Sequence, residues 1–245
     1  MSEITQYSKD WFNKQKTGAF NSAEIILPIV IDLVSPKSVV DIGCGVGMWL
    51  SVLYKKGITD ILGIDGKWID ESQLNIPKEL FRAEDIDKPF NVGRTADLAM
   101  SLEVGEHLPE NTSSQLIKTL TDTAPVVLFS AAIPNQPGTK HINCQWPDFW
   151  ANLFKQYGFI PVDVIRPAVW TNPNVEYWYA QNTIVYVKEN LLDNYPKLKE
   201  KVLAGFSTAL PLVHPTRYMY ALIPPPSITF RTVRKIRSIM NRIVG

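Results

Sequence analysis

Cysteine and histidine are scarce in this 245-residue sequence, which has two cysteines, Cys44 and Cys144, and three histidines. Two cysteines without CxxC spacing form neither a disulfide framework nor a structural zinc site, and a reducing compartment is the simplest interpretation. The longest apolar run, IILPIVIDLV, is broken by Pro28 and Asp32, so we expect no membrane span. Because MSEITQYSKD lacks the features of a signal peptide, we expect a cytoplasmic protein.

Acidic residues are missing after Glu200, whereas seven lysines and arginines follow it. Without those seven positive charges the net charge of +1 becomes −6 for residues 1–200. The sequence therefore predicts an acidic domain over residues 1–221, a proline linker over 222–227 and a basic amphipathic helical tail over 228–245. Such a helix can pack on the protein body or on a second subunit, or it can lie on an anionic membrane surface at the inner face of the membrane.

Segments with strand and helix patterns alternate along the chain, which is typical of an α/β fold with a parallel sheet and helices on both faces. Two late segments, 160–165 and 175–187, read as an antiparallel strand pair that would make the sheet mixed. The expected helices cover 22–34, 47–56, 113–123 and 147–157, and the expected strands before the late pair cover 38–42, 60–65, 96–102 and 126–130.

The stretch VVDIGCGVG places a carboxylate and three alternating glycines directly after a buried strand. Glycine allows tight turns and leaves room for a ligand beside the backbone, and ligands of open α/β sheets bind at the carboxyl ends of the strands. A second acid, Asp65, ends the next strand 24 residues after Asp41, close to the offset expected for an acid that binds ribose hydroxyls. The loop lacks both the spacing that cradles a pyrophosphate and the lysine of a P-loop, so it is neither a dinucleotide fingerprint nor a P-loop.

Together with GID, AEDID and ADLAMSLEVGEHLP, this stretch resembles the class I S-adenosylmethionine-dependent methyltransferases over roughly residues 20–190. The resemblance implies a Rossmann-like seven-stranded mixed sheet whose last strand is antiparallel. It further implies S-adenosylmethionine as cofactor, with methionine-moiety contacts from Asp41 and the loop of Gly43, Cys44, Gly45 and Gly47, a ribose contact from Asp65 and an adenine contact from Asp85. Ser101, where a later strand ends, is expected on the same side.

A second polar cluster follows that later strand. Glu103, Glu106 and His107 are spaced so that one helical turn would place them on one face, and His141 follows a Gly-Pro-containing loop. Two carboxylates and two imidazoles could bind Mg²⁺ or Mn²⁺, and a metal lowers the pKa of a hydroxyl beside it. Without a metal, His107 or His141, with Glu106, would act as the catalytic base; a structural role is the third interpretation.

ExxEH with a distant histidine resembles the metal-dependent small-RNA 2′-O-methyltransferases and the quinone-precursor O-methyltransferases. The acidic body argues against nucleic acid as a partner. Aromatic residues and amides in QWPDFWANLFKQYGF and WYAQN suit a sugar ring, and these stretches resemble methyltransferases of bacterial polysaccharide assembly. We therefore expect an O-methyltransferase of a sugar hydroxyl in a glycan, nucleotide sugar or lipid-linked glycan. A phenol or RNA methyltransferase and a non-catalytic scaffold are the alternatives, and the oligomeric state stays open.

Overall fold

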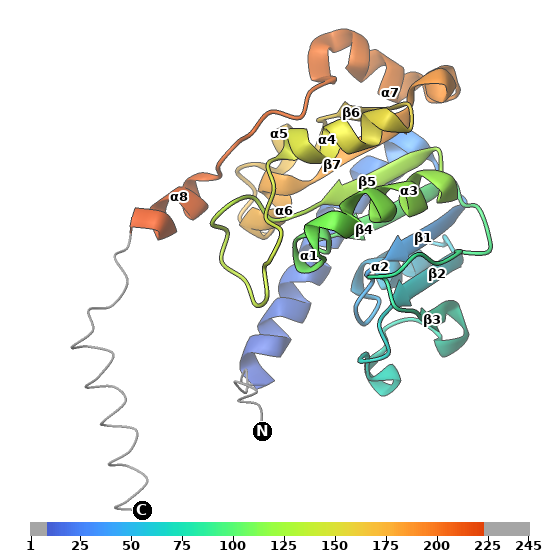
Figure 1. Cartoon of the computed structure of the whole chain (residues 1–245), viewed down its shortest axis with the longest axis vertical. Helices are drawn as coiled ribbons and strands as arrows, with labels where there is room; N and C mark the ends of the chain where they lie inside the picture. The colour runs from blue at the N-terminus through green and yellow to red at the C-terminus, as the bar shows by residue number, and fades with distance from the viewer. Residues whose placement is uncertain (1–8, 223–245) are drawn as a thin grey trace, which may run out of the picture. The chain divides into compact units, whose positions relative to one another are not determined.

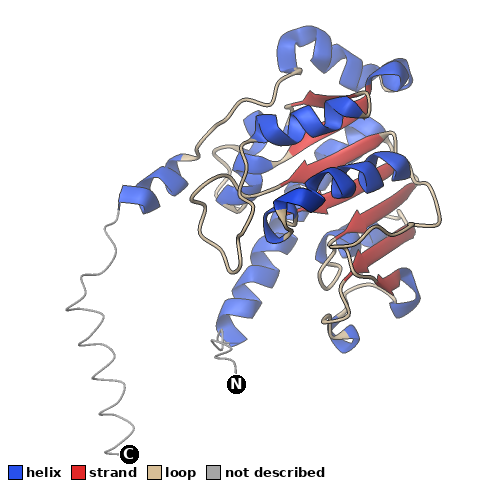
Figure 2. Cartoon of the chain, in the orientation of Figure 1, coloured by secondary structure: helices blue, strands red, loops and turns tan. Residues whose placement is uncertain are grey.

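The computed structural model describes residues 9–222, with side chains from Thr17 onward. Its centre is a seven-stranded sheet in the order β3-β2-β1-β4-β5-β7-β6 (Figures 1 and 2). The strands are β1 (Ser38–Ile42), β2 (Asp60–Asp65), β3 (Phe81–Ala83), β4 (Leu98–Leu102), β5 (Val126–Ser130), β6 (Phe159–Val162) and β7 (Ile184–Lys188). Strands β1 to β5 pair in parallel, and β7 is antiparallel to both β5 and β6. The predicted mixed sheet with an antiparallel last strand is confirmed.

Helices cover both faces of this sheet, and two separate apolar clusters hold them there. The α-helices are α1 (Lys9–Val34), α2 (Met48–Lys55), α3 (Ser113–Thr123), α4 (Pro147–Gln156), α5 (Ile165–Val169), α6 (Tyr177–Asn182), α7 (Pro196–Lys201) and α8 (Pro215–Leu222). Helices α3 and α4 pack on one face, in front of the sheet in Figure 1, and α1, α2, α5, α6 and α7 share the cluster on the other. Because strand side chains alternate between the faces, Val39 joins one cluster and Val40 the other.

Helix α1 is apolar enough to be a candidate membrane span: its stretch Thr17–Val34 has a mean hydropathy of 1.5. A helix buried in a protein core can be equally long and apolar. Ala23, Ile26, Leu27 and Val30 are fully buried in the apolar cluster that α1 shares with α2, so this helix belongs to the core. Its hydropathy reflects packing against the sheet.

Residues 175–187 correct one prediction, because they form α6 followed by β7 and not one continuous strand. The run VEYWYAQN is rich in aromatic residues, which favours a strand, but its last six residues form a helix. Tyr177 and Tyr179 therefore lie on a helix. Tyr179 is instead buried, and its ring lies 5.0 Å from that of Trp49 in an edge-on contact.

A buried ion pair fixes the segment that follows α7. Arg166 is fully buried and donates from Nε and Nη2 to the two carboxyl oxygens of Asp163, at 2.8 and 2.6 Å. Its Nη1 donates to the carbonyl of Leu210 at 2.8 Å. The guanidinium thereby joins β6 and α5 to a segment more than forty residues later.

By its contacts the chain divides after Leu212 into two compact units. In the second unit, α8 begins at Pro215, and His214 caps it by accepting a hydrogen bond from the Thr216 backbone N–H. The predicted domain over 1–221 thus extends past this division. Apart from Leu222, the predicted linker over 222–227 and the basic tail over 228–245 lie outside the described residues.

Candidate active site

The glycine loop after β1 lies at the carboxyl edge of the sheet. Gly43, Gly45 and Gly47 all have positive φ angles, of 84°, 55° and 74°, which L residues with a side chain rarely adopt. A Cβ on Gly43 would lie 2.3 Å from the Val104 side chain, whereas one on Gly45 would meet nothing within 4 Å. The loop therefore presents bare backbone at Gly45 toward open space, which is the arrangement that a closely bound ligand needs.

Two buried acids flank this loop. Asp65, at the end of β2, accepts hydrogen bonds from the N–H groups of Gly45 at 2.7 Å and Gly66 at 2.6 Å. Asp41 in β1 is 3% exposed, and burial, followed by the charge of Asp65, raises the pKa of its carboxyl to about 8. Burial also raises the pKa of Asp65. The structure thus brings Asp41, the loop and Asp65 together as predicted.

The other predicted cofactor residues occupy three different surroundings. Ser101 in β4 is fully buried, and its Oγ has no hydrogen-bond partner among the described residues. The Cys44 thiol turns into the core, where it lies 2.8 Å from the Cβ position of Gly63, so any cofactor contact of Cys44 would come from its backbone. Asp85 follows β3 on the surface and pairs with Lys88 at 2.6 Å, which lowers the pKa of its carboxyl.

The second cluster forms at the ends of β4 and β5. Ligand atoms of Glu106, His107 and His141 all lie within 4.8 Å of one another. Glu106 and His107 belong to a short 3₁₀ turn over Gly105–His107, and His141 comes from the loop after β5. The backbone carbonyl of Glu106 accepts hydrogen bonds from the N–H groups of Ile142 at 2.9 Å and Asn143 at 3.1 Å. The two segments are therefore tied together beside the side chains that they contribute.

Glu103 neighbours Glu106 but does not belong to the turn that carries it, and it is not one of the three grouped ligand residues. It has a positive φ of 56°, and its side chain accepts hydrogen bonds from Gln136 at 2.9 Å and Asn182 at 3.0 Å. Gln181 donates in turn to the side chain of Gln136 at 3.1 Å. Gln181 and Asn182, the two amides of WYAQN that the sequence suggested for a sugar ring, are thus buried within the protein, where they fix Glu103. This network had no signal in the sequence.

Electrostatics at this cluster favour bound cations and neutral imidazoles. Glu106 is fully buried, neither of its carboxyl oxygens has a hydrogen-bond partner among the described residues, and burial and the charge of Glu103 raise its pKa well above the usual range. Burial lowers the pKa of His107, and burial and His107 together lower that of His141. A carboxylate in need of a positive partner, beside two imidazoles held neutral, is a donor set that fits a divalent ion.

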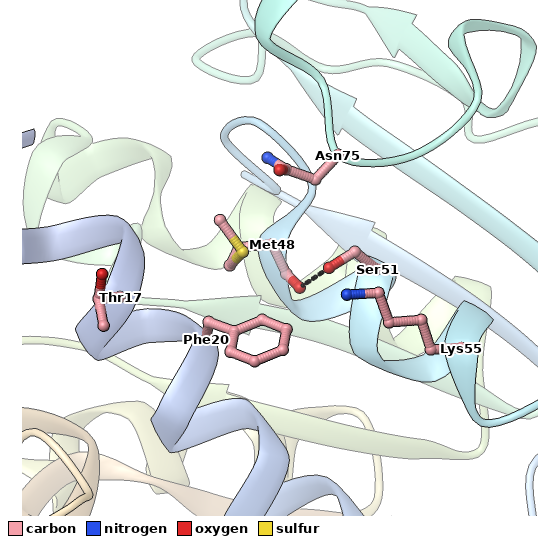
Figure 3. A pocket seen from close by; sticks show the side chains of 6 residues that line it. All are labelled: Thr17, Phe20, Met48, Ser51, Lys55 and Asn75. Atoms are coloured by element: carbon pink, nitrogen blue, oxygen red, sulfur yellow. Dashed lines mark hydrogen bonds between the residues drawn. The ribbon is translucent and has the colours of Figure 1, made fainter. Parts of the chain in front are cut away.

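A separate groove of about 320 Å³ opens between α1 and α2 (Figure 3). Its lining residues are Thr17, Phe20, Met48, Ser51, Lys55 and Asn75. The Lys55 ammonium lies 4.8 Å from the centroid of the Phe20 ring, and Ser51 donates to the carbonyl of Met48 at 2.7 Å. None of the predicted site residues lines this groove, although Met48 directly follows Gly47 of the loop.

The family model for a methyltransferase domain matches residues 22–164, more than half of the chain. The chain belongs to this methyltransferase family. The family and the fold together make it a class I S-adenosylmethionine-dependent methyltransferase, as the sequence predicted.

Solved structures agree on the fold. The sugar N-methyltransferase KedS8 from a Streptoalloteichus species superposes with a TM-score of 0.57 at 12% identity, over 77% of this chain and 95% of that one. The magnesium protoporphyrin IX methyltransferase from Synechocystis, solved with bound S-adenosylhomocysteine, superposes with a TM-score of 0.52 at 18% identity. The match covers 75% of this chain and 89% of that one. No curated protein matches the sequence.

Proposed function

We propose that this methyltransferase transfers the methyl group of S-adenosylmethionine to a hydroxyl oxygen of a sugar, with a divalent ion held by Glu106, His107 and His141. The observation that carries the proposal is the convergence of these three groups within 4.8 Å at the edge of the sheet where the glycine loop and Asp65 lie. The two parts of a methyl transfer, a methyl donor and an activated oxygen, need such adjacent sites.

The cofactor half supplies binding and orientation. Asp65 and the backbone at Gly45 would hold the ribose and methionine parts of the cofactor, whose sulfonium centre supplies the methyl group. Asp85, which follows β3 one strand further along the sheet edge, would contact the adenine amine. The open space in front of Gly45 leaves room for this nucleoside.

The second half prepares the acceptor oxygen. Bound at Glu106, His107 and His141, a divalent ion would supply Lewis acidity that lowers the pKa of an adjacent hydroxyl. Two imidazoles and one carboxylate suit Mn²⁺ better than Mg²⁺, which prefers oxygen ligands. Glu103, fixed by Gln136 and Asn182, adds negative charge next to Glu106 and strengthens the attraction for a cation.

A sugar acceptor is supported by the charge of the chain and by exposed apolar side chains that follow His141 in the sequence. Residues 1–200 carry a net charge of −6, which disfavours the phosphate backbone of RNA. Ile142, directly after His141, and Trp146 are 65% and 38% exposed, and an exposed indole suits the apolar face of a sugar ring. A lipid-linked glycan would also suit the predicted membrane contact of residues 228–245.

Transfer of radiolabelled methyl from S-adenosylmethionine tests the proposal, with nucleotide sugars, lipid-linked glycans, phenols and short RNAs as acceptors. Each acceptor is assayed with Mn²⁺, with Mg²⁺ and with EDTA. Label in a sugar that disappears with EDTA and returns with Mn²⁺ is the expected result. Label in a phenol or RNA alone would refute the sugar acceptor.

A metal-free reaction is the second candidate, and one observation favours it. Burial and His107 lower the pKa of His141, which keeps its ring neutral and able to accept a proton, and its Nε2 lies 3.9 Å from Glu106 Oε1 in the cluster. Transfer that persists in EDTA but is lost in His141→Ala would support this general-base reaction and reject the metal.

A further inference from the structure

The loop between β5 and α4 folds back so that the His141 ring lies against the backbone of Gly138. A Cβ built on Gly138 would lie 1.9 Å from Nε2, 2.1 Å from Cε1 and 2.5 Å from Cδ2 of that ring. Such distances are far below any real carbon contact, so even the smallest side chain at position 138 occupies the space of the imidazole.

Glycine at this position is needed for space and not for backbone conformation. The residues of this loop with positive φ are Asn135, at 64°, and Lys140, at 57°, and Gly138 is not among the glycines with positive φ. An alanine could therefore adopt the backbone of Gly138 without strain. The three atoms nearest to the added Cβ all belong to the His141 ring, so a substitution would act first on that ring.

The ring position that Gly138 permits is the one that forms the cluster. His141 Nδ1 lies 3.2 Å from the carbonyl oxygen of Gln136, on the other side of the folded loop. This contact turns the opposite nitrogen, Nε2, toward Glu106, and the ring lies edge-on to His107 with centroids 4.9 Å apart. A displaced His141 ring would lose its contacts with the Gln136 carbonyl, Glu106 and His107 together.

We propose that Gly138 is a positioning residue of the active site, which acts through His141 by leaving room for its imidazole beside Glu106 and His107. This inference rests on the proposed function for its catalytic meaning, but the steric relation does not depend on it. Replacement of Gly138 should disturb the cluster without disturbing the cofactor loop or the fold.

Two measurements on the full chain test the inference. The first is NMR of the histidine Cε1–H groups, which is feasible because the chain has only His107, His141 and His214. Signals are assigned with the corresponding alanine variants. In Gly138→Ala we expect the His141 signal to move, the His107 signal to move less, and the His214 signal to stay in place.

The second measurement is calorimetric binding of Mn²⁺ to the wild type, Gly138→Ala, His141→Ala and the double variant. We expect Gly138→Ala to weaken Mn²⁺ binding about 10- to 100-fold, as for loss of a group that orients a ligand. In the His141→Ala background the same change should add nothing, because Gly138 acts through that ring. Gly93→Ala is the control for a glycine replacement outside the cluster, because a Cβ on Gly93 would meet only a side-chain atom of Arg82 at 4.0 Å. Its positive φ makes the change strain the backbone, but Mn²⁺ binding should stay as in the wild type.

An unmoved His141 signal in Gly138→Ala, or a loss of Mn²⁺ affinity that persists in the His141→Ala background, would overturn the inference. Failure of the wild type to bind Mn²⁺ would instead reject the metal in the proposed function, and the NMR measurement would still decide the role of Gly138. Gly138→Ser repeats both measurements with a second small side chain, for which we expect the same displacement.

Discussion

The two halves of the proposed active site are built in different ways. The central part of the cofactor half is backbone and two acids that lie within 25 residues of sequence, from Asp41 to Asp65. The acceptor half consists of side chains from two segments, with His141 brought to Glu106 by a long loop. A cofactor common to many enzymes needs a common backbone cradle, whereas an acceptor is recognised by side chains that can differ between enzymes of one fold.

This difference implies that the two halves can be damaged separately. Changes at the glycine loop should weaken cofactor binding, and changes at the cluster should slow transfer while cofactor binding stays intact. Each of the following predictions tests that separation.

The largest effect is expected in the acceptor half, from His141→Ala. Loss of a metal ligand or a base should lower kcat by about 10²- to 10⁴-fold, with the affinity for S-adenosylhomocysteine within about twofold of the wild type. Steady-state transfer and calorimetry measure the two quantities. His214→Ala, which removes a helix cap in the other unit, is the control and should retain kcat.

The next effect concerns the cofactor half and compares two neighbouring glycines. Gly45→Ala places a methyl group in open space that the cofactor is expected to fill, so it should weaken S-adenosylhomocysteine binding about 10- to 100-fold. The positive φ of Gly45 should lower the free energy of unfolding of this variant by only about 1 kcal/mol. Gly43→Ala instead collides with Val104 at 2.3 Å and should lower the free energy of unfolding by about 3 kcal/mol.

The control for Gly43→Ala is the double variant with Val104→Ala, which removes the colliding methyl groups and should restore part of the stability. Urea unfolding and calorimetry separate the two effects. Equal losses of stability in Gly43→Ala and Gly45→Ala would contradict the geometry.

A smaller effect follows from the raised pKa of Asp41, about 8 in the folded protein against 3.8 for a free aspartate. Between these values the folded state holds a proton that the unfolded state has lost, so this residue reduces stability progressively as the pH rises from about 4 to about 8. Asp41→Asn removes the dependence. Its stability relative to the wild type should therefore increase from pH 5 to pH 8 and level off above that.

Urea unfolding of both proteins across this range, without cofactor, measures the difference. Asp122→Asn is the control, since Asp122 is an exposed partner of Lys118 on α3 and its loss should change stability by less than about 0.5 kcal/mol at either pH. A constant difference between Asp41→Asn and the wild type would show that Asp41 is not protonated in the folded state.

The smallest effect is expected at Asp85, whose carboxylate is exposed and already paired with Lys88. Loss of one exposed hydrogen bond to the adenine amine should weaken S-adenosylhomocysteine binding about 2- to 10-fold in Asp85→Ala. S-inosylhomocysteine, which lacks that amine, should bind the variant and the wild type equally well. A loss of affinity for both ligands would place the adenine elsewhere.

The same contrast explains what the sequence could predict. The cofactor half was predictable because its signals are local. A strand, an acid and alternating glycines follow one another directly in the sequence, and they lie in the same order in the structure. The strands over 38–42 and 60–65 and the helix over 113–123 match the structure residue for residue. The sequence does not predict the short strand β3, because three residues carry no detectable periodicity.

In the acceptor half, the histidines and acids could be named but not placed. Nothing local shows that Glu103 leaves the turn of Glu106, because its orientation is set by Gln136 and Asn182, which are distant in sequence. The aromatic run at Tyr177 was misassigned to a strand, because tertiary packing of Tyr179 on Trp49 outweighs its strand propensity. The role of Gly138 likewise depends on a side chain three residues away that only the folded loop brings back.

The bond from Arg166 to the Leu210 carbonyl limits how far the chain can be shortened. A protein cut before Leu210 would leave a fully buried guanidinium N–H without an acceptor, at a free-energy cost of about 1–3 kcal/mol. That is a sizeable part of the roughly 5–15 kcal/mol by which domains are stable. A protease-resistant core of this enzyme should therefore still contain Leu210 at its C-terminal end.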